Sequence, residues 1–181
     1  MDELQLIAGC KAKKRESQRM LYEFYARKMY GVCLRYSNSP EDAQDLLHDG
    51  FIKVFNNIDS FSGKGSFEGW LKRIFINMAL ENFRKSKSIF NNSEGIENVP
   101  EIVDDSTEED IALISEGDLM GMIRLLPKGY RTVFNLYAIE ELSHKEIAQL
   151  LGINEASSRS QYNRARQILQ NKVKDFLHSA E

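Results

Sequence analysis

The sequence lacks the short motifs that mark the common nucleotide-binding, metal-dependent and nucleophile-based enzymes. Its 181 residues contain no Gly-rich phosphate loop, no GxSxG and no HExxH pattern. Cys10 and Cys33 do not form a CxxC pair, and the three histidines lie far apart in the chain. We therefore predict no catalytic residues, no metal site and no cofactor, and we expect that the protein is not an enzyme.

Long hydrophobic runs are also absent. No apolar stretch approaches the roughly 20 residues that a membrane span requires, and the first residues lack the apolar h-region of a signal peptide. We therefore expect a soluble, cytoplasmic protein that does not insert into a membrane.

Charge is unevenly distributed along the chain. The net charge is only -3, yet residues 94–110 hold eight acidic residues and no basic one, whereas residues 159–174 hold five basic residues and no acidic one. A net negative chain does not coat nucleic acid indiscriminately, so any nucleic-acid contact should be confined to local basic surfaces.

The periodicity of apolar residues predicts an all-α protein with two small helical domains joined by a flexible linker. Residues 1–87 form the first domain, in which residues 1–36 read as helical. Residues 88–108 are rich in Ser, Asn, Glu and Asp and show no sustained period, which is typical of a linker. Residues 109–181 form the second domain.

A glycine-serine loop in the first domain precedes a predicted helix over residues 70–84. The spacing places Leu71, Ile74, Phe75 and Met78 on one buried face. Three polar residues share another face: Arg73, Asn77 and Arg84. Arginine neutralises phosphates and an amide reads base edges, which suits melted nucleic acid, although a core helix with a solvated basic side is equally compatible.

The helix before that loop has a clear start, with Ser39 as N-cap and Pro40 as the first helical residue. Its predicted buried residues are Ala43, Leu46, Leu47, Gly50 and Val54. A neighbouring face carries Asp45, His48, Asp49 and Ile52. Such a face is commonly only solvated, but an exposed Phe51 or Phe55 beside it would indicate a protein partner.

The second domain contains the pattern of a helix-turn-helix. Ser143 and Glu146 form a capping box, Gly152 supports the turn, and a second helix follows. Its expected outer side combines groups suited to phosphates and major-groove base edges. The residues concerned are Arg159, Ser160, Asn163, Arg164 and Arg166.

Taken in order, three segments resemble those of an extracytoplasmic-function (ECF, group IV) RNA polymerase sigma factor, a sigma-70 family class that retains only regions 2 and 4. The segments are YSNSPEDAQDLLHDGFIKVF, FSGKGSFEGWLKRIFINMALENFRK and LPKGYRTVFNLYAIEELSHKEIAQLLGINEASSRSQYNRARQIL. The resemblance implies a factor that binds core RNA polymerase and directs it to specific promoters.

The resemblance also implies roles for individual residues in region 2. The face that would dock on the clamp helices of the largest polymerase subunit comprises Asp45, His48, Asp49, Phe51 and Phe55. Opening and recognition of the minus-ten element would involve Lys64, Gly65, Ser66, Phe67, Arg73, Asn77 and Arg84. Trp70 would pack beneath the pocket for the captured base.

In region 4, Arg159, Ser160, Asn163, Arg164 and Arg166 would read the duplex minus-thirty-five element. Residues 126–137 resemble the surface that receives the flap of the second-largest subunit, and an anti-sigma protein is a possible further partner. Ser158 and Tyr162 depart from the family's usual valine and leucine, an exchange that conserves approximate volume.

Two other functions remain open at this stage. A free-standing helix-turn-helix regulator would bind duplex DNA and use residues 1–85 for sensing or dimerisation. A pure interaction protein would occupy polymerase without opening DNA. The acidic face at Asp45 and Asp49, combined with the stretch of residues 64–84, argues against the first. The basic loop and the recognition helix argue against the second.

Overall fold

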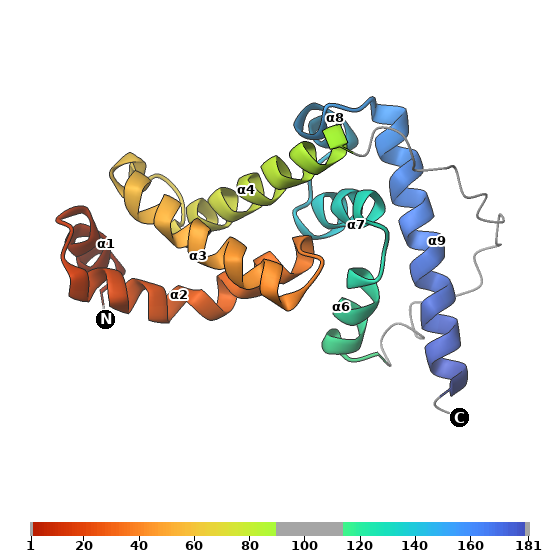
Figure 1. Ribbon diagram of the computed structural model, residues 1–181, viewed down its shortest axis with the longest axis horizontal. Helices are drawn as coiled ribbons and strands as arrows, with labels where there is room; N and C mark the ends of the chain where they lie inside the picture. The colour runs from red at the N-terminus through yellow and green to blue at the C-terminus, as the bar shows by residue number, and fades with distance from the viewer. Residues whose placement is uncertain (1, 90–113, 180–181) are drawn as a thin grey trace. The chain divides into compact units, whose positions relative to one another are not determined.

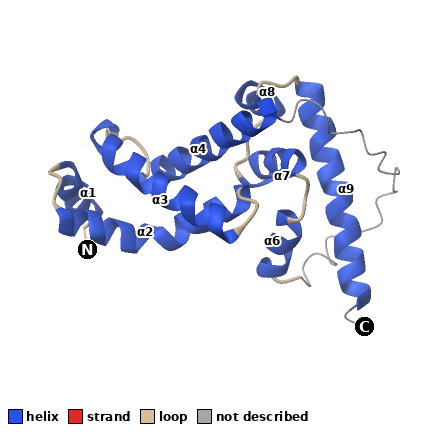
Figure 2. Cartoon of the chain, in the orientation of Figure 1, coloured by secondary structure: helices blue, strands red, loops and turns tan. Residues whose placement is uncertain are grey.

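The computed structural model describes residues 2–89 and 114–179, and these are helical with turns and no strand (Figures 1 and 2). The chain divides into two compact units, Met1–Lys85 and Ser86–Glu181. The all-α prediction is confirmed. The predicted linker, residues 88–108, lies outside the described residues except for its first two positions, which continue the last helix of the first unit.

The first unit contains α1 (Glu3–Lys11), α2 (Arg15–Tyr36), α3 (Pro40–Asn57), the short 3-10 helix η1 (Ile58–Ser60) and α4 (Phe67–Ile89). The helical reading of residues 1–36 is thus resolved into two helices separated by a tight turn, in which Lys13 has a φ of 56°. The helices approach closely at Gly9, where an added Cβ would lie 2.1 Å from Ser17 Oγ. Glycine permits this contact because it has no side chain.

Helix α3 begins as predicted. The side chain of Ser39 accepts a hydrogen bond from the backbone N–H of Asp42, and Pro40 is the first helical residue. All five residues of its predicted core stripe are buried. At Gly50 an added Cβ would lie 2.0 Å from Phe75 Cε1, so α4 packs directly on this point of α3.

Helix α4 begins three residues earlier than predicted, at Phe67. Leu71 and Phe75 are buried as expected, whereas Ile74 and Met78 are only half-buried. The face toward the core instead follows the spacing of four residues and ends on Ala79 and Leu80. The prediction therefore placed the buried face at the wrong angle around the axis of α4. The helix has two adjoining apolar rows, and the position of α3 decides which of them is covered.

The second unit contains α6 (Glu116–Arg124), α7 (Lys128–Phe134), the π-helical turn η2 (Asn135–Ile139), α8 (His144–Leu151) and α9 (Glu155–Ser179). Its core includes Met122, Ile123, Leu126, Ala165, Leu169 and Val173. The capping box of Ser143 and Glu146 is present, and Gly152 has a φ of 65°. The helix-turn-helix prediction is confirmed in its local details.

Candidate functional sites

The first candidate site is the acidic face of α3. Asp45, His48 and Asp49 are exposed, and Ile52 is 59% exposed beside them. These positions recur at three- and four-residue spacing, so they occupy one side of the helix. This side of α3 therefore presents two carboxylates, one imidazole and one apolar side chain to solvent.

Phe51 does not belong to this exposed face. It is 2% exposed, and its ring lies 4.7 Å from that of Tyr22 and 5.4 Å from that of Phe75, measured between ring centroids. Phe55 is half-buried, with its ring 6.0 Å from Phe51. Phe51 therefore supports the face from within, which corrects its assignment as a surface contact.

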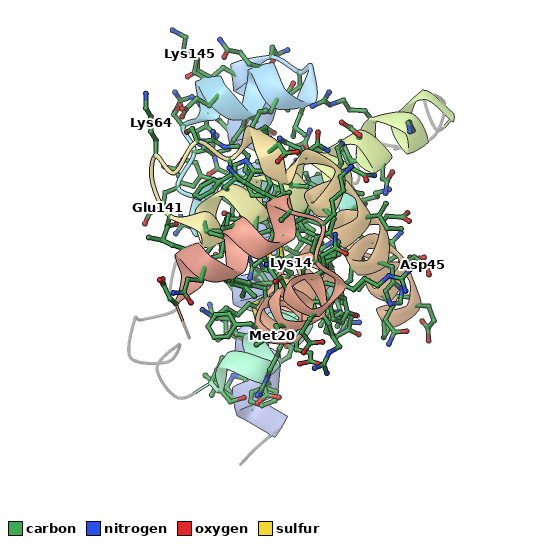
Figure 3. The ribbon with its side chains drawn as sticks, turned by 90° about the vertical axis from the view of Figure 1, so that its left-hand side faces the viewer. Lys14, Met20, Asp45, Lys64, Glu141 and Lys145 are labelled. Atoms are coloured by element: carbon green, nitrogen blue, oxygen red, sulfur yellow. The ribbon has the colours of Figure 1, made fainter. Side chains whose placement is uncertain are left out.

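The second candidate site is the loop of residues 62–66 between η1 and α4. All five residues are exposed, and Gly63 and Gly65 have φ values of 76° and 82°. Ser66 Oγ accepts a hydrogen bond of 2.9 Å from the N–H of Gly69 and so caps α4. Within this unit, Lys64 and Asp45 project from opposite sides (Figure 3).

Phe67, at the end of this loop, points into the interior. It is 1% exposed and packs on Tyr25, Phe61 and Trp70, with ring centroids 5.7, 5.0 and 5.5 Å away. We call these four residues the aromatic cluster. Phe67 was predicted to contact DNA, and its burial corrects that assignment. Trp70, which was expected to pack, stacks on it.

The polar side of α4 adjoins the loop in sequence. Arg73, Asn77 and Arg84 are exposed, at spacings of four and seven residues that keep them on one side of the helix. Glu68, at the start of α4, forms ion pairs with Lys28 and Lys72 at 2.7 and 3.4 Å. The hydrogen bond from Lys28 lowers the pKa of Glu68, so this carboxylate stays ionised.

The third candidate site is the outer side of α9. Ser160, Asn163 and Arg166 are exposed, and Arg159 forms an exposed ion pair with Glu155. Arg164 lies elsewhere: it is half-buried, and its Nη1 donates a 3.3 Å hydrogen bond to Tyr130 Oη. Five residues separate Arg159 from Arg164, which places them about 140° apart around a helix. The structure therefore divides the predicted residues between two flanks.

Beneath these residues, a buried polar contact joins the two helices of the helix-turn-helix. His144 Nδ1 lies 2.9 Å from Ser158 Oγ, and Ser158 is fully buried. Tyr137 stacks on the His144 ring at 4.4 Å, and Tyr162 lies 4.4 Å from Tyr137. From the sequence, Ser158 and Tyr162 were interpreted only as an exchange that conserves side-chain volume. The contact with His144, 14 residues before Ser158, was missed.

The His144 contact predicts a pH-dependent stability of the second unit. Burial, reinforced by repulsion from Arg159 and opposed by attraction to Glu155, lowers the pKa of His144 below its usual 6.5. The imidazolium therefore favours the unfolded state, so this contribution is complete above about pH 6.5 and is lost as the pH falls toward the lowered folded pKa. The free energy of unfolding should fall between about pH 7 and 5.

Backbone amide hydrogen exchange in α8 and α9, compared at about pH 7 and about pH 5, measures this loss of stability. His144→Gln, which keeps a hydrogen-bonding group but does not titrate, should show a smaller difference between the two conditions. Equal pH dependence in both proteins would exclude His144 as the source.

Within residues 2–89 and 114–179, no three His, Cys, Asp or Glu side chains gather as metal ligands would. Over the same part of the chain, no helix has the length and apolarity needed to span a membrane.

Leu125, 70% exposed between α6 and α7, is an apolar surface residue that sequence reasoning did not single out.

Comparison with known proteins gives two family matches. Residues 21–89 match Sigma-70 region 2, and residues 116–169 match Sigma-70, region 4. The ECF RNA polymerase sigma factor SigW of Bacillus subtilis (strain 168) is 30% identical over 165 residues, which are 86% of this chain and 88% of SigW. SigE of Mycolicibacterium smegmatis (strain ATCC 700084 / mc(2)155) is 34% identical over 163 residues, 87% of this chain and 61% of SigE.

A solved structure has the same fold. The sigma factor RpoE, in its co-crystal structure with the anti-sigma factor NepR from Bartonella quintana, aligns with a TM-score of 0.51 and 19% identity, over 86% of this chain and 96% of RpoE. At that identity the likeness supports the fold alone. Together with the two region matches and the similarity to SigW, the helical units show that this chain belongs to the ECF sigma factors of the sigma-70 family, which direct RNA polymerase to initiate transcription at specific promoters.

Proposed function

We propose that the chain acts in transcription initiation through three different surfaces of its own, each of which binds a different partner. It does not itself catalyse a reaction. The face of Asp45, His48, Asp49 and Ile52 docks on the clamp helices of the largest polymerase subunit. Loop 62–66 and the polar side of α4 bind the opened minus-ten element. The outer side of α9 binds the duplex minus-thirty-five element. The family resemblance also makes an anti-sigma protein a candidate partner.

The observation that carries this proposal is the position of two surfaces on the first unit. Asp45 and Lys64 project from opposite sides of it (Figure 3), and both are exposed. A protein partner on the acidic side would leave the loop free to meet DNA. A sensing or dimerising domain requires no such pair of chemically opposite surfaces.

The loop has properties suited to an unpaired base. Its two glycines at positive φ allow the backbone to approach a ligand closely, and Asn77 on the exposed side of α4 offers an amide for a base edge. Unpairing costs a few kcal/mol per base. Hydrogen bonds to the extruded base and neutralisation of its phosphates by Lys64 and Arg73 would offset part of that cost.

In the second unit, the exposed side of α9 fits a major groove. Ser160 and Asn163 present hydrogen-bonding groups, and Arg159 and Arg166 lie on the adjoining flank, where they suit phosphates. Leu125 immediately precedes the segment predicted to receive the polymerase flap, and the 37% exposed Tyr137 is the last residue of that segment. They provide the apolar contacts that such a protein interface requires.

Reconstituted transcription tests the proposal. Core polymerase with this protein should start transcripts at cognate promoters, and promoter thymines around the minus-ten element should become reactive to permanganate. Tight duplex binding by the protein alone, with no initiation in the presence of core polymerase, would support the regulator instead. Initiation-deficient complexes with unreactive thymines would support a protein that only occupies polymerase.

Arg164→Ala tests the flank of α9 that faces α7. If Arg164 leaves Tyr130 to contact DNA, promoter affinity of the holoenzyme should fall by about 1–3 kcal/mol, or about 5- to 150-fold. Tyr130→Phe removes only the hydroxyl that Arg164 contacts and is the matched control; we expect promoter affinity close to that of the unchanged protein. Equal affinity for Arg164→Ala would assign Arg164 to packing.

A further inference from the structure

Helix α1 lies outside the segment that matches sigma region 2, which begins at residue 21. It nevertheless packs against η1 as well as α2. The element after η1 is loop 62–66, which we have proposed to bind an unpaired base. The contacts at both ends of α1 involve residues that flank this loop.

The C-terminal end of α1 contacts the residue that precedes the loop. Lys11 Nζ donates a hydrogen bond of 2.8 Å to the carbonyl oxygen of Phe61, 50 residues away. This contact is partly buried, and the Phe61 ring belongs to the aromatic cluster. A charged donor in such a position fixes a carbonyl more strongly than a neutral one. The loop therefore begins next to a backbone position, the Phe61 carbonyl, that α1 holds in place.

The N-terminal end of α1 contacts the residue that follows the loop, through one intermediate ring. Tyr25 Oη donates a hydrogen bond to Glu3 Oε2. The Tyr25 ring packs edge-on against Phe67, which begins α4. Burial and the bond to Glu3 both raise the pKa of Tyr25, so the phenol stays protonated and continues to donate.

Helix α1 is itself held firmly. Leu6, Ile7 and Cys10 are buried, and the close approach of Gly9 to Ser17 fixes its C-terminal end against α2. A lysine on a freely moving segment could not hold the loop in place. Here packing holds the backbone that carries Lys11, and the hydrogen bond to Phe61 holds its ammonium group.

We propose that α1 acts as a brace for loop 62–66, which means that it holds the two ends of the loop in place. Lys11 is a positioning residue that fixes the first of these ends. The proposal rests on the function proposed for that loop. Two glycines give residues 62–66 many accessible conformations, and ordering them on DNA costs free energy. Holding both ends before DNA arrives reduces that cost without any contact between Lys11 and DNA.

Lys11→Met tests the brace, because methionine keeps most of the aliphatic length and removes the donor. In the free full-length protein, we expect NMR order parameters of Gly63, Lys64 and Gly65 to fall toward about 0.6 or below. In the holoenzyme, affinity for a single-stranded minus-ten oligonucleotide should fall about 3- to 10-fold. Lys14→Met, at the exposed position that immediately precedes α2, should change neither quantity.

Two further measurements separate the possible results. Lys11→Arg keeps a charged donor and should restore both loop order and affinity, which general misfolding of α1 would not predict. Unchanged order parameters in Lys11→Met would overturn the brace, whatever the DNA result. Failure of the wild-type holoenzyme to bind the oligonucleotide would instead overturn the proposed function of the loop.

Discussion

Replacing Asp45 and Asp49 together by arginine is expected to abolish assembly with core RNA polymerase. Both side chains are exposed on α3 around Ile52, so the substitutions reverse the charge of the face without disturbing the buried stripe. Complementary charges across an interface determine its partner, and like charges brought together cost several kcal/mol. We therefore expect affinity for core polymerase to fall by about 100-fold or more.

The affinity of labelled protein for core polymerase measures this effect. Asp59→Arg with Asp175→Arg is the control, since it makes the same change in net charge at two exposed acids outside the face. Circular dichroism should show that both variants remain helical. Assembly of the Asp45 and Asp49 variant at the wild-type affinity would mean that the face is only solvated.

The second large effect is expected at Phe67. Truncating Phe67 to alanine removes a ring that is 1% exposed and packs on three other aromatic residues. Loss of a buried phenylalanine ring costs about 3–5 kcal/mol in the free energy of unfolding, from lost transfer energy and the cavity that remains. The first unit should therefore be strongly destabilised in the absence of DNA and polymerase.

Urea unfolding followed by tryptophan fluorescence measures this effect, because the chain has a single tryptophan and it lies in the aromatic cluster. Leu4→Ala is the control in the same unit: Leu4 is 69% exposed, and its truncation should change stability by less than about 0.5 kcal/mol. Unchanged stability of Phe67→Ala together with weaker DNA binding would return Phe67 to the DNA surface.

The predictions that rested on local chemistry agree with the structure. Ser39 and Ser143 cap helices because a hydroxyl side chain accepts from backbone N–H groups that lack a helical partner. Gly152 adopts a left-handed conformation where α8 must end. These interactions span no more than a few residues, so the sequence around them is sufficient to predict them.

The sequence did not predict the burial of Phe51 and Phe67, for a reason common to both. Each aromatic residue adjoins exposed polar positions, so spacing along one helix left it free to face either solvent or the core. The partners that cover these rings, Tyr22 and Tyr25, come from α2, at least 29 residues earlier in the chain. Periodicity within one helix carries no information about the position of another.

Sequence alone determined that this protein is helical, that it has two units with a helix-turn-helix in the second, and that it resembles an ECF sigma factor. Apolar period, caps and turn residues act over a few positions, and the family motifs lie within continuous segments. Only the tertiary structure decided which residues face outward around those motifs. It buried Phe51 and Phe67, set Arg164 against Tyr130, and joined Lys11 to Phe61 across 50 residues. Such contacts depend on how helices pack, which no single segment specifies.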